Sequence, residues 1–301
     1  MKNRVSQKGL SLIEIMIAMT ISLILLAGVG QIYISNKQTY RVTEAMSRMQ
    51  ENARFAIGFM TRSIRGADHW GCAGRWDNVA DAGFLVAGYG GGTATESSPG
   101  LSAQDDQPVT GLVDSDTIRL ISASEDASSV VSASGSSIVM DDASGFAVGD
   151  DIMINNCKSA QITSITNVSG NTLTIADALK QSYTIASVHK LQQTTYALGV
   201  SGGVPTLFMN DGTGAQPLIE GVENMQILFG GDSNSDMVAD YYVAAGTAGL
   251  DMSTVVSVKL TLTLRTINDN VALNSRAYNG ATDNRISKDY SATIALRNRL
   301  N

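Results

Sequence analysis

The chain has 301 residues, with 28 acidic and 21 basic side chains, and its formal net charge is −7 at neutral pH. An acidic chain is not expected to bind nucleic acid through the phosphate backbone, because such binding needs clustered Lys and Arg. Aromatic residues make up only 6% of the chain, while Gly, Ser, Thr, Asn and Asp are plentiful. We therefore expect loops and strands to dominate the part of the chain that follows its first helix.

An apolar segment at residues 10–34 is long enough to cross a bilayer. A transmembrane helix needs about 20 residues to span about 30 Å of hydrocarbon. Lys2, Arg4 and Lys8 precede the segment, and no acidic residue lies among them. By the positive-inside rule, the N-terminus stays in the cytoplasm and the remainder of the chain is exported.

The residues around the start of this segment read KGLSLIEIMIAM from Lys8 to Met19 and continue as TISLILLAGVG. An ordinary secretory signal is cut after its apolar run, and no A-x-A site follows here. The segment instead resembles the class III signal of type IV pilins and pseudopilins. That resemblance implies that prepilin peptidase cuts between Gly9 and Leu10 and that Leu10 becomes the N-methylated first residue. The leader is then residues 1–9, and the mature chain, with 18 basic and 28 acidic residues, has a formal charge of −10.

Glu14 is the only carboxylate in the apolar segment. A charge inside hydrocarbon costs about 2.5–3.5 kcal/mol or more, so such a residue is functional by default. After cleavage Glu14 is the fifth residue, close to the new ammonium group. The resemblance implies that Glu14 serves assembly by pairing with the N-terminus of a neighbouring subunit. The alternative is a signal anchor with an incidental glutamate.

The helix is predicted to continue beyond the membrane as an amphipathic segment at residues 35–66. Apolar side chains recur there at steps of three and four residues: Val42, Ala45, Met46, Met49, Ala53, Ala56, Ile57, Met60 and Ile64. We expect one helix from Leu10 to about Arg65, roughly 84 Å long at 1.5 Å per residue. Gly28, Gly30 and Gly58 are weak points of this helix. The alternative is a separate amphipathic helix after a break.

The periodicity ends after Gly66, and residues 67–301 are predicted to form a β-rich head. The stretches DHWGCAGRW, GYGGGTATESSPG and SAQDDQPVTG are interpreted as loops because Gly, Ser, Pro and Asp cluster in them. From Thr117 onward, short alternating runs separated by turn signals predict strands: TIRLIS, SSIVM, DIMIN, AQITSITNV, NTLTIA, YTIASVHKL and TLFM. Residues 125–187 are interpreted as a β insertion, either a small barrel or a sandwich.

Three blocks of sequence are similar to the PilW family of minor type IV pilins: ARFAIGFMTRSIRGADHWGC, GVENMQILFGGDSNSDMVADYYV and VVSVKLTLTLRT. The resemblance implies an α+β, type IV pilin-like fold, with a long N-terminal helix packed on an antiparallel β-rich head. In the third block Val256, Val258, Leu260, Leu262 and Leu264 alternate with polar residues. Such alternation is typical of a strand with one face on a helix.

The two cysteines, Cys72 and Cys157, lie in the exported part of the chain. An even pair in an oxidising compartment favours a disulfide, which here would tie the insertion to the end of the helix. The alternative is two free thiols. A zinc site would also need His69 or His189, and we do not expect one.

Asp232, Asn234, Asp236 and Asp240 have an oxygen-rich spacing that resembles the start of a calcium loop. Met237 stands where an EF-hand requires glycine, and Val243 stands where it requires glutamate, so the segment is not an EF-hand. A calcium-stabilised turn of another kind and a solvated hairpin turn rich in Asp and Asn both stay open. Calcium is the only cofactor that the sequence suggests, and none is required.

The signal and the PilW-like blocks together favour a minor pilin, held in the inner membrane with a periplasmic head and later placed at the tip or base of a pilus. Its expected partners are the other minor pilins, the major pilin, prepilin peptidase, the assembly platform and the lipid bilayer, and its expected role is to prime assembly or to cap the tip. The alternatives are a large minor pseudopilin of type II secretion and a tip adhesin or DNA-uptake pilin that binds ligand through residues 125–187. An enzyme is not expected, because no catalytic motif is present.

Overall fold

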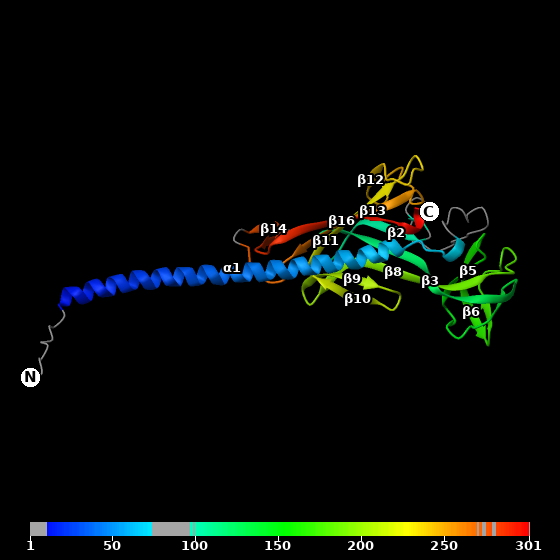
Figure 1. Ribbon diagram of the computed structural model, residues 1–301, viewed down its shortest axis with the longest axis horizontal. Helices are drawn as coiled ribbons and strands as arrows, with labels where there is room; N and C mark the ends of the chain where they lie inside the picture. The colour runs from blue at the N-terminus through cyan, green and yellow to red at the C-terminus, as the bar shows by residue number, and fades with distance from the viewer. Residues whose placement is uncertain are drawn as a thin grey trace, which may run out of the picture.

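The computed structural model describes residues 11–73, 97–98, 100–269, 271–272, 275–278 and 281–300. One long helix, α1 (Leu12–Gly66), projects from an antiparallel β-rich head (Figure 1). The helix runs without interruption through Gly28 and Gly30, so the prediction of one helix rather than two is confirmed. The leader and Leu10, including the predicted cleavage site, lie outside the described residues.

The two halves of α1 differ in what surrounds them. No residue of its most apolar stretch is buried within the molecule, and the helix is long and apolar enough to cross a membrane. The half in the head buries one stripe at steps of three and four residues: Met49, Ala53, Ala56, Met60 and Ile64. These residues pack in the main core, so the amphipathic pattern correctly predicted the buried face.

The head contains two short 3₁₀ helices and sixteen strands among the described residues. The short helices are η1 (Gly71–Ala73) and η2 (Arg297–Arg299). The first ten strands are β1 (Ser97–Ser98), β2 (Leu101–Gln107), β3 (Ser115–Ser134), β4 (Ser137–Met140), β5 (Asp151–Asn155), β6 (Ala160–Ser169), β7 (Thr172–Ile175), β8 (Ser187–Ser201), β9 (Val204–Asn210) and β10 (Ala215–Glu220). The last six are β11 (Val222–Gly231), β12 (Tyr241–Val243), β13 (Val255–Arg265), β14 (Arg276–Tyr278), β15 (Ala281–Asp283) and β16 (Ser287–Ala295).

The four-stranded sheet, in the order β12–β11–β13–β16, and the sheet around β3, β8 and β9 share one core with α1. Val258, Leu260, Leu262 and Leu264 of β13 lie in this core with the buried stripe of the helix. The alternating strand therefore packs with α1, as its pattern predicted. The antiparallel α+β architecture is confirmed.

Six strands form a closed ring. The order β3–β4–β7–β6–β5–β8 returns to β3, because β8 also pairs with β3. A closed ring leaves no open edge, as in a small β-barrel. The barrel has an apolar core of its own, whose buried residues lie between Val130 and Val188. The region interpreted as an insertion, residues 125–187, thus contains a barrel, although β3 and β8 continue from it into the rest of the head.

Two segments interpreted as loops contain strands. Ser97–Ser98, in GYGGGTATESSPG, form β1 and pair with β2. Leu101–Gln107, which include the first six residues of SAQDDQPVTG, form β2 and pair with β3. Leu101 and Ala103 are buried at alternate positions, while the polar residues between and after them are more exposed. The acidic and amide side chains concealed this alternation in the sequence. In the run YTIASVHKL the strand begins later than predicted, at Ser187, and β8 extends beyond the run to Ser201.

Candidate functional site

The first turn of α1 places Glu14 beside the position where the mature chain is predicted to begin. Ser11 is the N-cap: its hydroxyl accepts a hydrogen bond from the N–H of Ile13, and Glu14 Oε2 accepts one from the N–H of Ser11 over 3.0 Å. This reciprocal pair is a capping box. The carboxylate of Glu14 is thereby fixed at the N-terminal end of the helix, where its negative charge interacts favourably with the helix dipole.

Apolar side chains cover the membrane half of α1 and point into the surroundings. Leu12, Met16, Met19, Leu23 and Leu26 are all strongly exposed. Exposed apolar surface of this extent marks a membrane or protein interface. A shallow groove also runs along this half of the helix, and it is lined by Ile15, Ala18, Met19, Ser22, Leu23 and Leu26.

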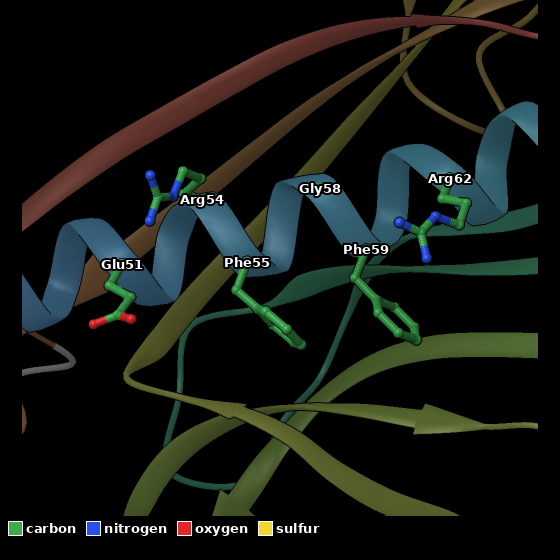
Figure 2. A pocket seen from close by; sticks show the side chains of 6 residues that line it. All are labelled: Glu51, Arg54, Phe55, Gly58, Phe59 and Arg62. Atoms are coloured by element: carbon green, nitrogen blue, oxygen red, sulfur yellow. The ribbon is translucent and has the colours of Figure 1, made fainter.

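A second groove lies on α1 within the head, with a volume of about 360 Å³. Figure 2 shows the side chains that line it: Glu51, Arg54, Phe55, Gly58, Phe59 and Arg62. The rings of Phe55 and Phe59 stack with their centroids 6.1 Å apart, and Phe59 meets Tyr196 of β8 edge-on at 6.5 Å. Tyr196 also shares a 2.7 Å hydrogen bond with Ser63, so β8 supports this side of the helix.

The end of α1 is tied to the barrel by the disulfide expected between Cys72 and Cys157. The bond joins η1 to the turn between β5 and β6, across 85 residues of sequence. Asn155 lies beside it, with Oδ1 at 3.0 Å from the sulfur of Cys72. His69 and Trp70 follow the helix, and Trp70 is fully buried, with its indole N–H donated to Asp68.

Two family models match the chain. The model described as type IV pilus-assembly protein W matches residues 181–298, and that of the prokaryotic N-terminal methylation motif matches residues 4–30. Both matches support a type IV pilin of the PilW family. No curated protein and no solved structure matches it.

The membership assigns the general role of the molecule. A PilW-family pilin is a minor pilin of the type IV pilus, so the chain is a structural subunit and works together with other pilins and the pilus machinery. The methylation motif covers Gly9, Leu10 and Glu14 and lies at the start of the apolar helix. The pilin is therefore a single-pass membrane protein that later enters the pilus.

The acidic turn of this PilW-family pilin is held by its own backbone. Asp232 Oδ1 accepts hydrogen bonds from the N–H groups of Asn234, Ser235 and Asp236, and its Oδ2 accepts one from Met237. Burial works to raise the pKa of Asp232, but these donors outweigh it and lower the pKa. Asp240 in turn accepts two hydrogen bonds from Ser233. The residues proposed as calcium ligands thus already have partners.

Sequence reasoning missed a different acidic cluster in the PilW-family head, at Asp105, Asp106 and Asp116, whose carboxylate oxygens lie within 4.8 Å of one another. Asp116 is buried and accepts hydrogen bonds from the N–H of Asp106 and from Ile227 on β11. Burial raises the pKa of Asp116 to about 6, helped by the charge of Asp105 and opposed by the two backbone donors. Asp116 therefore joins the two sheets through a carboxyl group that titrates near neutral pH.

Proposed function

We propose that this PilW-family pilin joins a complex of minor pilins in the inner membrane, which primes assembly of the pilus and then occupies its tip. The observation that carries this proposal is the position of the barrel. Figure 1 places the barrel strands β5 and β6 past the C-terminal end of α1, at the end of the molecule away from its N-terminus. In a fibre whose subunits stack along their helices, a body in that position hinders the next subunit, whereas a tip subunit has none above it.

The position of this pilin in the fibre tests the proposal. An epitope tag on an exposed turn of the barrel, such as Gly135, is expected to label one end of sheared pili as a single spot. A strain that lacks the chain is expected to carry few or no pili, and the wild-type chain should restore them. Label spread along the fibres, or normal piliation without the chain, would contradict the proposal.

A second candidate function is adhesion through the barrel. The N–H of Val130 donates to the carbonyl of Ala186 over 2.9 Å, so the neighbouring Val131 and Ile185 lie close together. Their side chains are 58% and 87% exposed, which is unusual for aliphatic residues on a small barrel. A surface ligand with an apolar face would be the partner of such a patch.

Removal of the barrel separates the two functions. Ala123 of β3 pairs directly with Leu191 of β8, so a two-residue Asn-Gly turn can join them in place of residues 124–190. The variant also needs Cys72→Ser, because Cys157 is removed. A priming subunit without its barrel should still restore piliation, whereas an adhesin would give fibres that no longer bind the surface.

The membrane-stage partners test the assignment to the pilus rather than to type II secretion. We expect the full chain, extracted in mild detergent, to co-purify with the other minor pilins of the same cell. Purification with pseudopilins alone would instead indicate the secretion machinery.

A further inference from the structure

We propose that the face of α1 around Arg54 and Arg62 binds the helix of a different pilin, seated at the same depth in the membrane and carrying carboxylates at that height. This inference rests on the proposed priming complex, and adds the chemistry by which its subunits select one another.

The two grooves lie on the same side of α1. Residues on this side follow one another at steps of three, four or seven, and so share one face of a helix with 3.6 residues per turn: Ile15, Met19, Ser22, Leu26, Val29, Tyr33, Tyr40, Glu44, Glu51, Phe55, Gly58 and Arg62. The buried stripe from Met49 to Ile64 lies on the opposite face. A partner that covers the exposed face therefore continues from the membrane into the head, and a parallel membrane-anchored helix has that shape.

Gly58 leaves room for such a helix. A glycine inside a helix costs about 0.5–1 kcal/mol relative to alanine, so its presence needs a reason. Apart from the neighbouring residues and the backbone of the helix itself, no described atom lies within 4 Å of the position that a Cβ at Gly58 would take. The chain itself therefore does not require the glycine, whereas a neighbouring helix could approach the bare backbone closely between Phe55 and Arg62.

The charges lining the groove, two arginines against the one carboxylate of Glu51, favour an acidic partner. Arg54 and Arg62 are exposed, and neither makes an ion pair within the part of the chain that the structure describes. In Figure 2 the side chain of Arg62 lies next to the ring of Phe59, whereas Arg54 projects from the helix on the other side from the two rings, one residue before Phe55. Guanidinium groups beside an apolar contact favour carboxylates on the incoming surface.

Membrane depth excludes a second copy of this chain as that partner. Two copies at the same depth would bring Arg54 and Arg62 opposite the same arginines. A stagger of 10 or 11 residues would pair Glu44 with Arg54 and Glu51 with Arg62, but it displaces one helix by about 15–16 Å at 1.5 Å per residue. That is about half of the 30 Å hydrocarbon layer, so one of the two apolar segments would leave the membrane.

Photo-crosslinking in the membrane of living cells tests the inference. The full chain carries p-benzoylphenylalanine in place of Phe55, and the crosslinked peptide is identified by mass spectrometry. We expect a helix of another pilin with Asp or Glu next to the crosslink. The double variant Arg54→Glu/Arg62→Glu should lower the yield roughly tenfold, because two attractions become two repulsions. Changing the partner's carboxylates to lysine should restore the crosslinking yield of this double variant.

The control is Lys259→Glu/Lys288→Glu, which makes the same change of charge at exposed positions on β13 and β16 and should leave the yield unchanged. Formation of the Cys72–Cys157 bond in every variant verifies folding. Crosslinks only to a second copy, or a yield insensitive to reversal at Arg54 and Arg62, would overturn the inference. Piliation measured in the same strains distinguishes the proposed priming function from the inference about Arg54 and Arg62. If the chain primes pili but does not form this crosslink, the inference is wrong and the priming function stands.

Discussion

Arg299 and Asp68 form a buried ion pair that joins the last residues of the chain to the end of α1. Arg299 Nε donates to Asp68 Oδ2 over 2.5 Å, and both side chains are only 2% exposed. Arg299 Nη1 also donates to the carbonyls of Met252 and Val255. The adjacent Asn298 donates to the carbonyls of Gly66 and Ala67 and so satisfies acceptors at the C-terminal end of the helix.

Removing one partner of this pair should destabilise the head strongly. Arg299→Ala leaves the carboxylate of Asp68 buried without its counter-charge, and we expect a loss of about 3–5 kcal/mol in the free energy of unfolding. Urea denaturation of the detergent-solubilised chain measures it. Asp68→Asn/Arg299→Met, which removes both charges, should cost less than Arg299→Ala, and an equal or larger loss would show that the charge pair is not the cause.

Loss of the disulfide should loosen the barrel from the helix. The 85-residue separation of Cys72 and Cys157 corresponds to about 4–5 kcal/mol in the loop-entropy model, with less expected in practice. We expect Cys72→Ser/Cys157→Ser to lower the Tm and to make the turn between β5 and β6 more accessible to protease. Reduction of the wild-type chain should have the same effect and should leave the double variant unchanged.

Glu14→Gln should block entry into the fibre without preventing insertion into the membrane. The amide keeps the size of the side chain and removes the charge available to a neighbour's N-terminus, while it makes the segment more apolar. We expect normal amounts of chain in the membrane fraction but at least about tenfold less in sheared pili, if one ion pair is lost in a medium of low dielectric. Ser11→Ala, which removes only the helix cap, is the matched control and should assemble.

Chelation of calcium should leave the Tm of the wild-type chain unchanged, because backbone donors already occupy both carboxylate oxygens of Asp232. Asp232→Ala should instead destabilise the turn whether or not calcium is added, since it removes those acceptors. Thermal unfolding with EDTA and with calcium distinguishes a calcium site from a turn held only by its own backbone. A rise in Tm on adding calcium that Asp236→Asn abolishes would establish the calcium site.

Protonation of Asp116 should make the head more stable in mild acid than at neutral pH. Its pKa is raised to about 6 in the folded chain, above its ordinary value of 3.8, so the folded state holds the proton more tightly. Asp116 therefore adds up to roughly 3 kcal/mol to the free energy of unfolding. This stabilisation is fully present below the pKa of the unfolded chain and is lost as the pH rises through about 6.

Asp105→Asn removes the neighbouring charge that raises this pKa. We expect the variant to gain stability at pH 7.5 and to lose part of the difference in Tm between pH 4.5 and pH 7.5. Asp126→Asn, on an exposed part of β3, is the control for a general effect of charge. An unchanged pH dependence in Asp105→Asn would contradict this account of Asp116.

Local patterns predicted much of the fold, whereas distant contacts could not be predicted. The short apolar run in DIMIN and the helical spacing from Met49 to Ile64 identified β5 and the buried face of α1. The capping box of Ser11 and Glu14 corresponds to an S-x-x-E pattern, which is a local signal for the start of a helix. Nothing in the sequence near Arg299 indicates Asp68, 231 residues away. The cluster at Asp116 was missed because Asp105 and Asp106 were assigned to a loop.

The continuity of β3 and β8 has a mechanical consequence. These strands, of 20 and 15 residues, begin or end in the barrel and also flank the core that holds α1. The disulfide provides a second, covalent route from the barrel to the end of the helix. A tensile force applied to the barrel would therefore reach the helix by two routes, the paired strands and one covalent bond, so that the pilin shares a pull between them.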